Sequence, residues 1–221
     1  MKNKTWSESL LFATFLTLAG GLQDGYSYAL RGKVFVNALT GNVVLMAFNL
    51  AEGNFPAMLR YFIQIASFAL GVYVSGRVAF AEKRHMGLHF KQRILAAEII
   101  ILVVVGFLSK ELDSIANSMM AFSCGMQVNT FRKFADINAA TTMCVGNVRT
   151  IMHNLAGYHH TKGTAHKEAS RTVLFIVCIF FLGAFIGGIF FPLLELRTIW
   201  LSAAFLVVSF LILHMDPAIR T

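Results

Sequence analysis

The chain has 221 residues, of which 57% are hydrophobic and 14% are charged, and its mean hydropathy is +0.65. Soluble domains are about 45–50% apolar and about 25% charged, so this composition excludes an ordinary soluble domain and predicts surfaces that face lipid. The formal net charge of +8 would suggest nucleic acid in a soluble protein, but here the basic residues lie between apolar runs. We therefore expect no nucleic-acid partner, and we expect the basic residues to contact anionic lipid head groups of a bilayer.

Several apolar runs approach the length of about 20 residues that crosses a bilayer, and they predict an all-α, polytopic membrane helix bundle. The candidate spans are, in chain order, Leu10–Leu30, Pro56–Phe80, Ile94–Leu108, Ile115–Phe134, Thr172–Leu194 and Thr198–Leu213. Two further apolar segments, Val34–Ala51 and Ile137–Gly157, are interrupted by Asn, Thr and Gly. Whether these two segments cross the bilayer decides the architecture.

The distribution of Lys and Arg favours re-entrant segments, because cytoplasmic loops carry an excess of these residues. If every segment crosses, the basic residues divide almost evenly between the two faces. If the two interrupted segments enter and leave on the same face, most basic residues lie on the side of the N-terminus, including those in 83–93 and 162–171. Arg31 then belongs to a loop on the opposite face. We therefore predict six spans plus two re-entrant or broken motif helices.

The two interrupted segments repeat one sequence. From Gly41 to Ala51 and from Gly146 to Ala156 the runs agree at Gly, Asn, Val, Asn, Leu and Ala. A Gly-x-Gln motif at Gly21 recurs at Gly125, and a glycine-containing helix, FALGVYVSG, recurs as FFLGAFIGG. The spacing of small residues in these helices favours close packing of the two halves or of a homodimer.

We interpret residues 1–221 as a single membrane domain with two internal repeats, 1–109 and 110–221. Three spans in each repeat would place the second upside down relative to the first, which is the inverted-repeat plan of many channels and transporters. The binding sites of such proteins lie near the bilayer midplane, where broken helices meet. The repeats therefore predict one polar site between the motifs at Gly41-Asn42 and Gly146-Asn147.

Each motif stands at the predicted start of a short helix. We expect Thr40 to cap the first helix, which runs to Leu50, and Gly53 to mark its end. Thr141 and Thr142 stand in the matching place of the second half. The Gly of each motif is expected to let another backbone approach closely. Two helix N-termini that face each other favour an anion or a polar neutral solute.

The candidate solute-binding residues are polar or ionisable side chains in or beside these segments. They are Gln23, Asp24, Asn37, Thr40, Asn42, Gln127, Thr141, Thr142, Asn147 and Arg149. The Asn side chains line a solute pathway or, alternatively, only cap and cross-link broken helices.

Ionisable groups inside apolar segments are costly and therefore become functional candidates. Asp24 is a proton carrier or the counter-charge of a cation. Alternatively, it is a buried partner of Arg149 or of a backbone N–H group, or it lies near the interface. Arg149 pairs with Asp24, attracts an anion or extends to the cytoplasmic face. Glu98 and Arg77 lie near the ends of candidate spans, so we expect both at the interface.

The run GLQDGYSYALRGKVFVNALTGNVV resembles the signature of the YoaK-type family of uncharacterised bacterial inner-membrane proteins. The matching residues of the first half are Gly21, Asp24, Phe35, Asn37, Thr40, Gly41 and Asn42. In the second half the matches are Gly125, Gln127, Thr141, Thr142 and Gly146, whereas Val128, Val145 and Val148 depart from the pattern. The resemblance covers nearly the whole chain. It implies a multi-pass protein of the bacterial cell inner membrane, and it implies no activity.

We predict a channel or secondary transporter for a small polar or anionic solute, with a structural or partner-binding membrane protein as the alternative. We expect no enzyme, because no HExxH, GxSxG or Walker motif is present. No cofactor or metal is expected, since the cysteines lack metal-ligand spacing. His159, His160 and His166 share a basic segment that we expect to be solvated.

Overall fold

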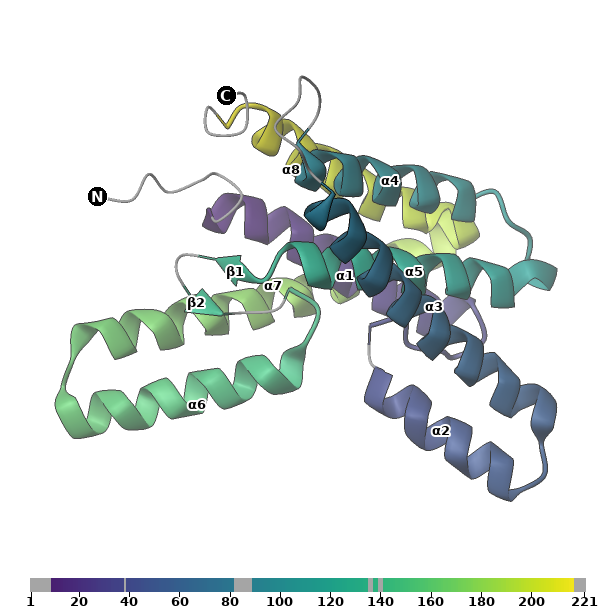
Figure 1. Cartoon of the computed structure of the whole chain (residues 1–221), viewed down its shortest axis with the longest axis horizontal. Coiled ribbons are helices and arrows are strands. Elements are labelled where there is room, and N and C mark those ends of the chain that lie inside the picture. Colours follow the sequence, from purple (N-terminus) through teal and green to yellow (C-terminus); the bar gives the residue numbers. More distant parts are fainter. Residues whose placement is uncertain (1–8, 38, 82–88, 135–136, 139–140, 217–221) are drawn as a thin grey trace.

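The computed structural model describes residues 9–37, 39–81, 89–134, 137–138 and 141–216, which are almost entirely helical (Figure 1). The helices are α1 (Leu10–Leu30), α2 (Leu39–Ala51), α3 (Phe55–Phe80), α4 (Phe90–Val105), α5 (Asp113–Thr130), α6 (Cys144–Thr161), α7 (Thr164–Leu194) and α8 (Ile199–His214). Short 3-10 helices precede α5 (η2, Lys110–Leu112) and α8 (η3, Glu195–Thr198). The prediction of an all-α fold is confirmed, apart from a small antiparallel hairpin of β1 (Lys133–Phe134) and β2 (Ile137–Asn138).

Local chemistry explains the ends of these helices only in part. The Ser9 side chain accepts a hydrogen bond from the Phe12 N–H and caps α1, and Gly53, with φ of 72°, follows the end of α2 as expected. Thr40 lies within the first turn of α2, which begins at Leu39, so its predicted capping role is wrong. The expected cap at α6 is also wrong, because Met143 holds the N-cap position and makes no side-chain capping bond.

The helices α1 and α5 form the centre of the molecule. The helices α7 and α8 pack on α1, and α3 and α4 pack on α5. Polar side chains such as Gln23 in α1 and Asn117 and Gln127 in α5 are therefore buried among protein groups. A helix surrounded by protein can carry such residues, because neighbouring helices supply their hydrogen-bond partners.

Matched pairs of glycines bring helix backbones into direct contact. A Cβ atom added at Gly21 of α1 would overlap the carbonyl oxygen of Phe180 in α7, and one at Gly183 of α7 would overlap that of Leu18 in α1. The helices α5 and α3 repeat this arrangement. A Cβ at Gly125 would overlap the Phe68 carbonyl, and one at Gly71 would overlap the Phe122 carbonyl. The glycines thus seat sequence-distant helices against each other, which was one of the two roles expected for them.

Arg31 follows the last residue of α1, in the connection where the sequence placed it, and its side chain is fully buried. Its Nε donates to the Tyr26 hydroxyl, and Nη1 donates to the Asp113 carboxylate at 2.8 Å. The two terminal nitrogens also donate to three backbone carbonyl groups between Val105 and Ser109. All five guanidinium donors therefore have acceptors. The side chain is buried because the connection from α4 to α5 folds over it.

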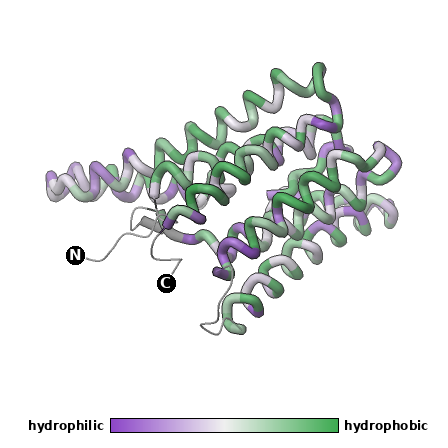
Figure 2. Tube along the Cα trace, turned by 90° about the horizontal axis from the view of Figure 1, so that it is seen from above, coloured by the Kyte–Doolittle hydropathy of each residue, from purple (hydrophilic) through white to green (hydrophobic). Residues whose placement is uncertain are grey.

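Two segments of the described chain are long and apolar enough to cross a membrane, namely α3 and the stretch Thr164–His214 that contains α7 and α8. Their outward faces expose large apolar side chains, including Phe62 and Tyr73 on α3 and Phe181 and Phe185 on α7. Figure 2 shows apolar residues along most of the helices, with polar residues gathered toward their ends. The fold is thus compatible with a membrane protein, while the number of spans stays a prediction.

We predict that Gly183→Ala lowers the apparent melting temperature of the purified protein, whereas Gly188→Ala in the same helix does not. The added methyl group at Gly183 overlaps the α1 backbone, and such overpacking costs about 1–3 kcal/mol. A Cβ at Gly188 meets nothing within 4 Å, so the higher helix propensity of Ala is retained there. Equal melting temperatures for the two variants would contradict the backbone contact.

Arg31→Gln should destabilise the fold by about 3–5 kcal/mol, because it leaves buried acceptors and Asp113 without their cation. Arg60→Gln is the matched control, since Arg60 is exposed. Thermal denaturation of both variants measures the difference. A loss for Arg31→Gln no larger than that for Arg60→Gln would show that the buried network does not stabilise the fold.

Candidate functional site

The chain turns back toward the centre after α1 ends at Leu30. The Asn37 backbone N–H donates to the Asp24 carboxylate at 2.9 Å, and its side-chain amide donates to the Gly20 carbonyl at 3.1 Å. Because an α-helix rises 1.5 Å per residue, these contacts lie about 9–15 Å before the end of α1. The helix α2 therefore starts level with the middle of α1.

The segment before α6 reaches the same level from the other half of the chain. Gln127 of α5 donates to the Thr141 hydroxyl at 3.3 Å and to the Leu16 carbonyl of α1 at 3.4 Å. A Cβ added at Gly20 would stand 2.8 Å from the methyl group of Thr142. The residues that precede α2 and those that precede α6 thus converge on Gly20.

Half of the predicted site residues belong to this buried polar centre. The structure brings together Asp24, Asn37, Gln127, Thr141 and Thr142 around α1. Their solute-binding role stays a prediction, because the hydrogen bonds described here join protein groups to one another.

The remaining predicted residues lie elsewhere. Gln23 donates to the Ser202 hydroxyl of α8 at 3.1 Å, and Asn42 donates to the Phe35 carbonyl of its own loop at 2.7 Å. Thr40 is exposed on α2. These contacts agree with the alternative in which polar side chains cross-link helices.

Asp24 has a backbone partner rather than the arginine considered above. Its carboxylate accepts the Asn37 N–H, and no ion pair joins Asp24 to Arg149 in the described part of the chain. Arg149 instead lines a cavity beside α6.

The expected role of the motif glycines is wrong. A Cβ added at Gly41 or at Gly146 would meet nothing within 4 Å, so neither glycine permits a close backbone contact here. The close contacts are made by Gly21 and Gly125, which lie inside the central helices.

Several buried polar atoms near the centre lack a hydrogen-bond partner within the described residues. They are Thr17 Oγ1, Asn37 Oδ1, Asn42 Oδ1 and Thr142 Oγ1. A buried polar atom without a partner costs about 1–3 kcal/mol. The start of each motif helix therefore keeps hydrogen-bonding capacity that water or a polar solute can satisfy.

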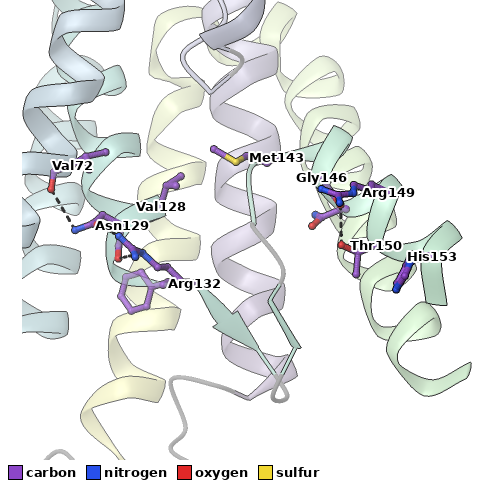
Figure 3. Close-up of a pocket in the computed structure, with 11 residues that line it drawn as sticks. Val72, Val128, Asn129, Arg132, Met143, Gly146, Arg149, Thr150 and His153 are labelled. Carbon is purple, nitrogen blue, oxygen red and sulfur yellow. Dashed lines mark hydrogen bonds between the residues drawn. The ribbon is translucent and has the colours of Figure 1, made fainter. Parts of the chain in front are cut away.

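A cavity of about 670 Å³ lies between the α3–α5 wall and the first turns of α6 (Figure 3). The cavity is lined by the apolar residues Val72, Val128, Phe131 and Met143 and by Gly146. Its polar lining residues are Asn129, Arg132, Asn147, Arg149, Thr150 and His153. No Asp or Glu of the described chain lines it, so every charged or titratable lining side chain is a base.

Hydrogen bonds hold the two walls of the cavity. On one wall Arg132 donates through Nε to the Asn129 carbonyl at 3.0 Å, and its guanidinium also contacts the Asn129 side chain. Asn129 donates in turn to Ser75 of α3 at 2.9 Å. On the other wall the Thr150 hydroxyl donates to the Gly146 carbonyl at 2.9 Å. Figure 3 shows Arg132 and Arg149 on these opposite walls.

The sequence repeat predicted residues of only one wall of this cavity, the wall formed by α6. Asn147 and Arg149 were candidates, whereas Asn129, Arg132 and His153 were not. A signal for His153 existed, since Arg149 and His153 stand four residues apart and share a helix face. Arg132 gave no such signal, because it follows the end of α5 and reads as an ordinary loop charge.

Comparison with known proteins gives one match. A model of the family described as "Protein of unknown function (DUF1275)" covers residues 12–212. Neither the curated proteins nor the solved structures include a match. Because the family model covers nearly the whole described chain, the protein belongs to the DUF1275 family.

Proposed function

We propose that the protein is a multi-pass membrane transporter or channel for a small anionic solute rather than an enzyme. The observation that carries this proposal is the cavity between Arg132 and Arg149, whose charged or titratable lining side chains are all basic. A guanidinium group offers N–H donors in a planar fork that suits a carboxylate or a phosphate. His153 adds a third group that binds an anion when it is protonated.

The exposed apolar faces support a place in the bilayer. Soluble monomers rarely expose large contiguous apolar patches, whereas Phe175, Phe181 and Phe185 of α7 and Phe62 of α3 are all exposed. We assign six spans to α1, α3, α4, α5, α7 and α8. The bacterial inner membrane is the localisation we propose, on the resemblance to the YoaK-type family.

The contacts of the two loops support re-entrant motif helices. Asn37 and Thr142 both reach the level of Gly20, in the middle of α1. A chain that returns to mid-span and starts a new helix there is tolerated only where protein or a water-filled cavity surrounds it. The helices α2 and α6 are therefore proposed to enter and leave on one face each.

The glycine contacts support two inverted repeats, 1–109 and 110–221. The contact of Gly21 with Phe180 matches that of Gly125 with Phe68. The helices α1 and α5 run antiparallel, because the end of α1 at Arg31 meets the start of α5 at Asp113. In this arrangement the same contact occurs twice, once in each orientation.

Anionic lipid head groups are the proposed membrane partners. A second cavity, of about 470 Å³, is lined by Arg77 and Arg132 together with the aromatic residues Tyr73, Phe80 and Phe90. Basic groups beside apolar rings suit the phosphate and the acyl chains of a lipid. Arg132 lies between this cavity and the solute cavity.

A thermal-shift titration tests the solute site. Inorganic phosphate, sulfate, acetate and oxalate should be compared with matched neutral solutes. We expect at least one anion to stabilise the wild type, and Arg149→Gln to weaken its binding about tenfold or more, which corresponds to about 1.4 kcal/mol. Arg171→Gln, an exposed position on α7, should bind as the wild type does. No anion effect, or equal binding by both variants, would favour the alternative of a structural or partner-binding protein or homodimer.

Cysteine accessibility tests the topology in a chain whose own cysteines are replaced by serine. Single cysteines at His89 and Gly163 should react with a membrane-impermeant thiol reagent from the cytoplasmic face, and those at Asn54 and Lys110 from the other face. The reason is that the end of α3 and the start of α4, which His89 precedes, lie on the same side of the molecule as the α6–α7 turn, which contains Gly163. Labelling of His89 and Gly163 from opposite faces would contradict six spans.

A further inference from the structure

Glu98 lies in the interior of the helix bundle rather than at the interface expected from the sequence. Its side chain is 0% exposed. The earlier placement is wrong because α4 begins at Phe90, so Glu98 stands about two turns inside the helix. It shares one face of α4 with Leu95 and Leu102, which belong to the main apolar cluster.

The helices around Glu98 leave its carboxyl group without a partner. The helix α4 packs mainly on α8 and α5. Two hydrogen bonds of the described residues join α4 to α8. Near the start of α4, the Gln92 side chain bonds the His214 ring, and near its end the Val103 carbonyl accepts a hydrogen bond from the Trp200 indole. Glu98 lies between these contacts. Neither of its carboxyl oxygens has a hydrogen-bond partner within the described residues.

No cation of the described chain neutralises this carboxyl group. The titratable residues of the elements packed on α4 are Arg60, Tyr61, Tyr73 and Arg77 on α3, Asp113 and Cys124 on α5, and His214 on α8. Of these residues, Asp113 forms an ion pair, and its partner is Arg31 at the end of α1. The helix α4 itself carries the bases Lys91 and Arg93 in its first turn, but neither carboxyl oxygen of Glu98 has a hydrogen-bond partner within the described residues.

The chemistry of the site selects its occupant. An ionised carboxylate that loses its water and gains no donor costs several kcal/mol. A metal cation would need several ligands, and the described residues contain no group of three or more His, Cys, Asp and Glu that could hold one. A proton needs a single carboxyl oxygen. On this basis we propose that Glu98 is a proton-binding site, and that the proton it takes from water is the coupling ion of the anion transport.

The helix α5 connects this site with the anion cavity. The helix α5 packs on α4, which carries Glu98, and its residues Val128 and Asn129 line the cavity. Release of the proton puts a negative charge into the apolar contact of α4 with α5 and weakens that contact. The wall that carries Asn129 then shifts relative to α6. The coupling step rests on the proposed function, whereas proton binding does not.

Infrared spectroscopy of the purified protein tests proton binding directly, without any solute. A protonated carboxyl group has a C=O stretching band that carboxylates lack. We expect such a band at neutral pH in the wild type, a smaller band in Glu98→Gln that lacks the contribution of Glu98, and a shifted contribution in Glu98→Asp. Glu111→Gln, at an exposed position of η2, is the control and should retain the band. Asp24→Asn and Asp216→Asn separate the contributions of the two other buried carboxyl groups of the described chain.

A full band in Glu98→Gln would overturn the proton site. Coupling is tested in proteoliposomes that contain a pH-sensitive dye, with phosphate or acetate gradients. Wild-type vesicles should show anion-dependent proton flux, and Glu98→Gln should lose it while the protein still folds. Unchanged flux in Glu98→Gln would overturn coupling alone. If no anion binds to the wild type, the proposed function fails together with coupling, and the infrared result still decides the proton site.

Discussion

The direct contact between helix backbones is the constraint on which the rest of this structure depends. In lipid, helices gain little from burying apolar side chains against each other, so packing relies on close approach at small residues. Gly21 and Gly125 provide that approach for α1 with α7 and for α5 with α3. Because the outer helices lie this close, they enclose the two central helices, and the polar groups of α1 and α5 can meet the loops that lead into α2 and α6. A side chain at either glycine would separate the outer helices from the centre and open this polar network.

Charge inside the bundle is handled in two different ways. Arg31 is buried with an acceptor for each of its donors and with Asp113 as its counter-ion, which is the condition under which a buried charge is tolerated. Glu98 is buried as completely but lacks any described partner. The first arrangement fixes the connection from α4 to α5 against the end of α1. The second leaves a group whose charge state can change, and the contrast between them separates a structural residue from a candidate switch.

The sequence predicted the positions of the helices far better than it predicted which side chains they bury and how they pack. The run Leu10–Leu30 coincides with α1, because composition and the flanking polar residues determine where an apolar helix begins and ends. The repeat also directed attention to Asn147 and Arg149, which line the cavity. It could not predict the burial of Arg31, since four of the five acceptors lie 74–82 residues away in the chain. The same reason applies to Arg132, whose place on the opposite wall depends on how α5 packs against α3.

The length of α7 has a consequence for the outside of the protein. Its 31 residues extend about 46 Å, whereas the hydrocarbon core of a bilayer is about 30 Å thick. In the proposed orientation its first turns, together with the end of α6, project into water as a polar arm, which is the leftmost part of the molecule in Figures 1 and 2. Lys162 and Lys167 of this arm stand over the Tyr158 ring. In that orientation the arm is the part of the protein that a soluble protease or an antibody reaches first from the cytoplasm.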